Sequence, residues 1–70
     1  MTQASAITVN GRPRALPAGS TVAALVRELD LEGKRIAVER NGEVVPRSRW
    51  ADTPVLSTDR LEIIGAVGGG

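Results

Sequence analysis

The sequence contains no cysteine, no histidine, no tyrosine and no phenylalanine, and these absences exclude several classes of function. Without cysteine there is no disulfide framework, no thiolate nucleophile and no cysteine-based zinc site. Without histidine the chain lacks the usual imidazole base and the commonest metal ligand of proteins. Trp50 is the sole aromatic residue, so an aromatic platform for single-stranded nucleic acid is not expected. We therefore expect no autonomous enzyme, no metal site and no bound cofactor.

Chain length and net charge exclude further classes of protein. The 70 residues suffice for one small domain with an aliphatic core. Nine Lys and Arg residues face eight Asp and Glu residues, and this near-balance does not favour a nucleic-acid partner. No apolar run is long enough to cross a membrane, and the first residues lack the basic and apolar regions of a signal peptide. We predict a cytoplasmic protein that binds neither nucleic acid nor membranes.

The first half of the chain predicts a hairpin and then a helix. Short strands are expected at residues 7–9 and 14–16 around an Asn-Gly dipeptide, which favours a tight hairpin turn. Prolines bracket the second strand, so it is expected to be short or to lie at a sheet edge. Residues 22–29 place apolar side chains on one stripe of a helix. Ser20 or Thr21 is its expected N-cap, and Gly33 its expected stop.

The second half predicts three more strands, at residues 36–39, 44–45 and 61–64, and a short turn or 3₁₀ element at 47–52 that holds Trp50. The order β-β-α-β-β-β places one helix on one face of a mixed sheet of about five strands. This is an α+β chain of the β-grasp class. We assign residues 6–64 to this domain, 1–5 to a loosely ordered N-terminus and 65–70 to a flexible glycine-rich tail.

The internal polar residues offer no catalytic set. Four carboxylates, which we interpret as solvated surface groups, fall on different predicted elements: Glu28, Glu39, Glu43 and Glu62. Arg47 and Arg49 flank Trp50 and are compatible with a cation–π cluster. We interpret this group as a surface patch around a half-buried anchor rather than as a partner contact.

The last four residues, Val67-Gly68-Gly69-Gly70, are the remaining unusual feature. One interpretation is an inert tail. The other is a thin segment that threads a narrow channel, because glycine adopts almost any backbone angle and has no side chain to obstruct it. Residues 65–70, fully extended, reach up to ~20 Å. The reacting group would then be the carboxylate of Gly70, which needs no histidine or cysteine beside it.

The chain resembles the ThiS family, the sulfur carrier proteins of thiamin biosynthesis. The resemblance covers about residues 7–70 and rests on segments 19–25, 37–47 and 61–63, on Trp50 and on the glycine end. Pro46-Arg47 with Trp50 at this spacing is its specific part. The sequence departs from the family at Thr58-Asp59-Arg60, where an Asp-Gly-Asp turn is usual.

The resemblance implies a ubiquitin-like carrier. An adenylating enzyme of the ThiF type would use ATP and Mg to activate the carboxylate of Gly70. Sulfur from a donor such as a cysteine desulfurase would convert it to a thiocarboxylate, and a thiazole synthase of the ThiG type would take that sulfur. Val67, Gly68 and Gly69 would be the residues by which partners recognise the tail.

Three alternatives remain open at this point. A sulfur carrier of molybdopterin synthesis would share the fold and the end chemistry, although a Pro-Pro stretch usually precedes its final glycines. A ubiquitin-like modifier would form isopeptide bonds through Gly70. A β-grasp interaction module would carry an inert tail.

Overall fold

The computed structural model describes residues 5–65. These residues form seven elements: β1 (Ser5–Val9), β2 (Arg12–Leu16), α1 (Val22–Glu28), β3 (Ile36–Arg40), β4 (Glu43–Val45), the 3₁₀ helix η1 (Arg47–Asp52) and β5 (Arg60–Gly65). β1 begins two residues earlier than predicted, and β5 extends from Arg60 to Gly65, one residue beyond the predicted strand at each end.

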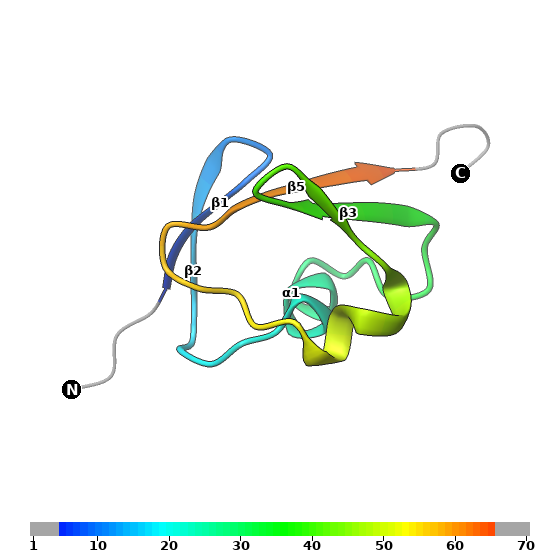
Figure 1. Ribbon diagram of the computed structural model, residues 1–70, viewed down its shortest axis with the longest axis horizontal. Coiled ribbons are helices and arrows are strands. Elements are labelled where there is room, and N and C mark those ends of the chain that lie inside the picture. Colours follow the sequence, from blue (N-terminus) through cyan, green and yellow to red (C-terminus); the bar gives the residue numbers. More distant parts are fainter. Residues whose placement is uncertain (1–4, 66–70) are drawn as a thin grey trace.

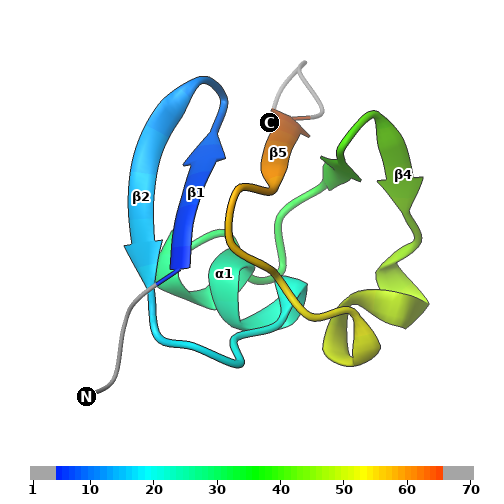
Figure 2. The same ribbon diagram turned by 60° about the vertical axis from the view of Figure 1, so that its left-hand side comes forward.

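The strands form one mixed sheet in the order β2-β1-β5-β3-β4. β5 runs parallel to β1 and antiparallel to β3, so the last strand of the chain lies at the centre of the sheet. Figure 2 shows β5 between the β1–β2 hairpin and the β3–β4 hairpin. In Figure 1 α1 and η1 lie on the same side of the sheet. This is the predicted β-grasp architecture, which is confirmed.

Both hairpins turn at an Asn-Gly dipeptide, as predicted. Asn10 and Gly11 have φ of 52° and 82°, and Asn41 and Gly42 have φ of 53° and 88°. Positive φ at both central residues is the geometry of a type I′ turn, which matches the right-handed twist of the strands. One detail of the prediction was wrong: Pro13 lies inside β2, opposite Thr8, rather than before it. An edge strand tolerates this proline because one of its sides has no neighbouring strand.

Helix α1 begins as predicted and ends earlier than predicted. Thr21 is the N-cap, and its Oγ1 accepts a hydrogen bond of 3.2 Å from the Ala24 N–H. Its last residue is Glu28 and Leu29 is its C-cap, because Asp30 adopts a φ of 61°. The Leu31 N–H then donates to the Val26 carbonyl at 3.0 Å, which is the closing bond of a Schellman motif. Gly33 is therefore not the helix stop, although its φ of 81° places it in a later turn.

The core lies between the sheet and the helices. Its buried side chains come from every element except β4, and from the loop before β5: Ile7, Leu16, Val22, Leu25, Val26, Val38, Trp50, Val55 and Leu61. Trp50 is only 8% exposed, so it is a buried core residue rather than a half-buried anchor. Its indole N–H donates to the Val45 carbonyl at 2.8 Å. Of the two flanking arginines, Arg47 covers the ring, with its guanidinium carbon 4.9 Å from the ring centroid.

Candidate functional site

The residues expected to react and to be recognised, Val67, Gly68, Gly69 and Gly70, lie outside the described residues. The structure does show the strand from which they continue. Gly65 is the last residue of β5 and still pairs with Ile36 of β3. It is exposed, and a Cβ built on it meets no atom within 4 Å. Strand pairing therefore holds the chain up to Gly65, its last described residue.

Two asparagine side chains bind β5 from both sides. The Asn10 amide oxygen accepts from the Ile63 N–H at 2.8 Å, and its amide nitrogen donates to the Ile63 carbonyl at 3.3 Å. This side chain continues the β1–β5 pairing beyond the point where the hairpin turns away. On the other side, the Asn41 amide oxygen accepts from the Arg60 N–H at 2.9 Å. The turn residues that the sequence assigned only to hairpin geometry thus also position the strand that leads to the tail.

A buried carboxylate fixes the entry to β5. Asp59 is the only buried charged side chain among residues 5–65, at 6% exposure. Its Oδ2 accepts from Arg40 Nε at 2.6 Å and from the Leu56 N–H at 2.8 Å. Its Oδ1 accepts from Asn41 Nδ2 at 3.0 Å. Sequence reasoning assigned Asp59 only to a turn, because its two side-chain partners lie 18 and 19 residues away along the chain.

The pKa of Asp59 follows from these contacts. Burial raises it, because a charged carboxylate is poorly solvated there. The hydrogen bonds from Arg40, Leu56 and Asn41, together with the positive charge of Arg40, lower it by more. The net effect is a pKa below the ordinary value of an aspartate. Asp59 is therefore ionised near neutral pH, and its oxygens are committed to structural bonds rather than to chemistry.

The turn before β5 contains a residue with an unusual backbone angle, Thr58. This residue adopts a φ of 69°, the left-handed region that glycine occupies without penalty. The turn is kept even so, because the Asp59 contacts on its C-terminal side hold it. The Asp59 N–H also donates to the Leu56 carbonyl at 3.1 Å and closes the turn.

Two of the four dispersed carboxylates are brought together by the fold. Glu39 of β3 and Glu62 of β5 are directly opposite each other in the strand register. They line a hollow of about 280 Å³ with Arg60 and the Asn41-Gly42 turn. Like charges directly opposite in a sheet are destabilising, and no local sequence pattern predicts this pairing. Within residues 5–65, no three His, Cys, Asp or Glu side chains are arranged to hold a metal ion.

Comparison with known proteins assigns the chain to a family. The sequence model of the ThiS family matches residues 7–70, which include all of the described sheet except the first two residues of β1, and the glycine end. The chain belongs to the ThiS family. The crystal structure of the thiamine biosynthesis protein ThiS from Geobacter metallireducens covers 100% of both chains, with a TM-score of 0.78 and 32% identity. The resemblance inferred from sequence is thereby confirmed.

Two curated relatives of this ThiS-family chain carry different names. The sulfur carrier protein ThiS of Bacillus subtilis is 36% identical over 50 residues, which cover 71% of this chain and 76% of that protein. A thiazole synthase of Paramagnetospirillum magneticum is 44% identical over 64 residues, which cover 91% of this chain. The chain spans only 20% of the length of that synthase. No helix within the described part of the chain is long and apolar enough to span a membrane.

Proposed function

We propose that this protein is a sulfur carrier of thiamin biosynthesis and that the carboxylate of Gly70 is its reactive group. The observation that carries the proposal is the family match, which extends to Gly70. The name of the Bacillus subtilis relative supports the carrier role. The position of β5 supports it too, because β5 is the central strand of the sheet and ends at the exposed Gly65, shortly before Gly70 in the sequence. The proposal requires a free carboxylate at Gly70.

The chemistry needs activation because a carboxylate is a poor electrophile. In the first step a carboxylate oxygen of Gly70 attacks the α-phosphorus of ATP on an adenylating enzyme of the ThiF type, and pyrophosphate leaves. The terminal sulfur of a persulfide, supplied by a donor such as a cysteine desulfurase, then bonds to the acyl carbon, and AMP leaves. A thiol, as two-electron reductant, cleaves the remaining S–S bond and leaves the thiocarboxylate. The partner stabilises the phosphate charges, so the carrier needs no phosphate-binding loop.

The residues of this chain present the reacting end and do not catalyse its reaction. Asp59, Asn10 and Asn41 hold β5 in place, and β5 fixes the origin of the tail. Gly68 and Gly69 leave room for a narrow channel, because each lacks a side chain. A thiazole synthase of the ThiG type is the proposed acceptor of the sulfur, supported by the Paramagnetospirillum magneticum synthase that contains a matching segment. Because the chemistry consumes ATP, we place the protein in the cytoplasm.

The substitution Gly69→Val tests the proposal. A branched side chain widens the tail, so adenylation should slow by about tenfold or more while the domain unfolds at the same temperature. The measurement is pyrophosphate release by the adenylating enzyme with ATP and Mg, alongside thermal unfolding followed by circular dichroism. Ala15→Val adds comparable bulk at an exposed edge-strand position and should leave the rate unchanged. Equal rates for Gly69→Val and the parent would contradict the proposal.

A further inference from the structure

We propose that a shallow basic hollow at the origin of the tail is the docking site for an acidic segment of the enzyme that adenylates Gly70. This inference rests on the proposed function. The proposed function so far involves only the tail and β5. This inference adds a surface with two arginines and the acidic character of the partner segment that binds there. The hollow has a volume of about 420 Å³. Its lining comes from the residue before β3, the start of β3, the start of η1 and the end of β5: Arg35, Ile36, Ala37, Arg47, Ile64 and Gly65.

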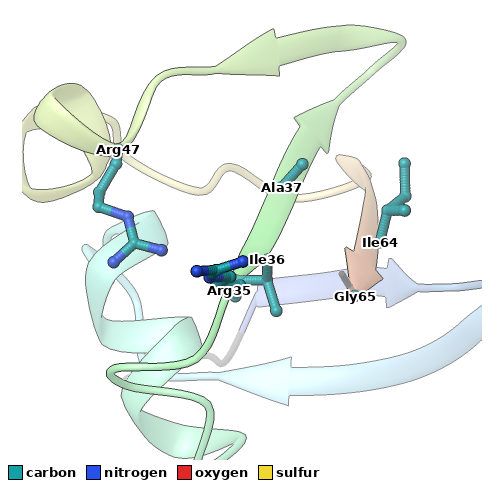
Figure 3. Close-up of a pocket in the computed structure, with 6 residues that line it drawn as sticks. All are labelled: Arg35, Ile36, Ala37, Arg47, Ile64 and Gly65. Atoms are coloured by element: carbon teal, nitrogen blue, oxygen red, sulfur yellow. The ribbon is translucent and has the colours of Figure 1, made fainter. Parts of the chain in front are cut away.

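Among the described residues, the lining of this hollow carries two positive charges and no carboxylate. In Figure 3 the guanidinium group of Arg47 points toward that of Arg35. Arg35 is exposed, and among residues 5–65 it makes no ion pair or side-chain hydrogen bond. Two neighbouring positive charges repel each other. An anion bound beside both is attracted by each guanidinium and also offsets their repulsion. A carboxylate suits this pair of arginines, because guanidinium groups bind carboxylates, as they bind phosphates, with paired hydrogen bonds.

Arg47 is already held in position for such a contact. Its guanidinium lies over the ring of the buried Trp50, with 4.9 Å between guanidinium carbon and ring centroid. Its Nη2 also donates to the Lys34 carbonyl at 3.0 Å. These two contacts leave further N–H groups of a guanidinium for a ligand. A side chain that is ordered before binding loses little entropy on binding, which favours affinity.

Apolar surface completes the hollow. Ile64 is 51% exposed, among the most exposed large apolar side chains of the described residues, and Ala37 is its direct partner across the β3–β5 pair. An apolar patch with positive charges beside it matches a segment that carries both acidic and apolar side chains. A free phosphate or a nucleic-acid backbone would use the arginines but not Ile64, so a protein segment fits the surface better.

The position of the hollow identifies which partner must cover it. Gly65 lines the hollow and is also the residue from which the tail continues. The five residues that follow span at most ~17 Å when fully extended. An enzyme that encloses Gly70 in its active site must therefore approach the surface around Gly65. The adenylating enzyme is the first partner to take up the tail, before any sulfur is attached, and we commit to it as the occupant.

The test measures binding of the full-length carrier to the adenylating enzyme without ATP, by titration calorimetry at low and high salt. Arg35→Glu should weaken binding by about tenfold or more at low salt, and the loss should shrink at high salt because ions screen exposed charges. Arg35→Lys keeps the charge but not the planar fork, so it should weaken binding less. Among the described residues Arg35 has no ion pair or side-chain hydrogen bond to lose, so unfolding temperatures should not change.

Arg12→Glu is the matched control, with the same change of net charge. Arg12 is exposed on the edge strand β2, three strand spacings from β3 and thus about 14 Å away across the sheet. It should bind within about twofold of the parent, whereas a loss equal to that of Arg35→Glu would reveal a general charge effect and overturn the inference. Unchanged binding by Arg35→Glu, or no binding by the parent, would overturn it as well. A charge-dependent complex that forms no thiocarboxylate would retain the docking site and reject the proposed function.

Discussion

Replacing Asp59 with asparagine tests whether its hydrogen-bond network fixes the start of β5. The variant keeps the size of the side chain and removes its charge. An amide has one acceptor oxygen, so its NH₂ group must face donors in either orientation. One side of the carboxylate faces Arg40 Nε and the Leu56 N–H, and the other faces Asn41 Nδ2. The change therefore loses acceptor contacts and places two donors against each other.

The expected loss of stability is a large fraction of the total. Hydrogen bonds to a charged group contribute roughly 1.5–3 kcal/mol each, and breaking a buried ion pair costs about 3–5 kcal/mol. The Arg40 side chain is 28% exposed, so water replaces part of what it loses. We expect the free energy of unfolding to fall by about 3 kcal/mol, which corresponds to a drop in Tm of about 12–24 °C for a domain of this size.

The network also makes stability depend on pH. Because the folded-state pKa of Asp59 lies below its unfolded value, its contribution is fully present above about pH 4 and is lost as the pH falls through the folded-state pKa. The difference in unfolding free energy between the parent and Asp59→Asn should therefore shrink in acid. Urea unfolding followed by the fluorescence of Trp50, at neutral pH and at several acidic values, measures both effects.

An exposed ion pair supplies the control. Arg27 and Glu32 lie 3.5 Å apart, with side chains 71% and 67% exposed. Glu32→Gln removes the same amount of charge and should change the unfolding free energy by less than about 0.5 kcal/mol. An Asp59→Asn variant as stable as this control, or a difference from the parent that stays constant in acid, would refute the structural role of the network.

Two further substitutions test the elements that hold β5. Thr58→Gly should raise the free energy of unfolding by about 1 kcal/mol. Glycine removes the penalty of the left-handed φ of 69°, and the larger entropy of the unfolded chain cancels only part of that gain. A lower Tm in calorimetry would contradict this. Asn10→Gly keeps the positive φ but loses both side-chain bonds to Ile63, so stability should fall by about 1–2 kcal/mol. Hydrogen exchange at the Ile63 amide should accelerate more than at the Val38 amide, and equal acceleration would count against a local role.

Local signals predicted much of the fold. The two Asn-Gly dipeptides identified both hairpin turns, and Thr21 identified the helix start, because each effect involves residues close in sequence. The helix end was placed too late because Asp30 adopts a positive φ that glycine would normally be expected to supply. Trp50 was predicted to be half-buried, but it is buried. Its hydrogen bond to the Val45 carbonyl and its contact with the Arg47 guanidinium form only when η1 packs against the domain.

The site was less predictable from sequence, for a physical reason. The contacts that position β5 join residues distant along the chain, such as Asn10 with Ile63, 53 positions apart. The partners of Asp59 and the facing pair Glu39–Glu62 depend on the strand register, which no local pattern specifies. The proposed reactive end, in contrast, was suggested by its composition, because a thin run of glycines fits a narrow channel.

The most direct test of the central claim is the intact mass of the protein after incubation with ATP, Mg, the adenylating enzyme and a sulfur source. The account predicts replacement of one oxygen by one sulfur, localised to Gly70 by fragmentation, and no such change when ATP is omitted. An unchanged mass with an adenylating enzyme that is active on another carrier would contradict the account, as would a sulfur located anywhere other than Gly70.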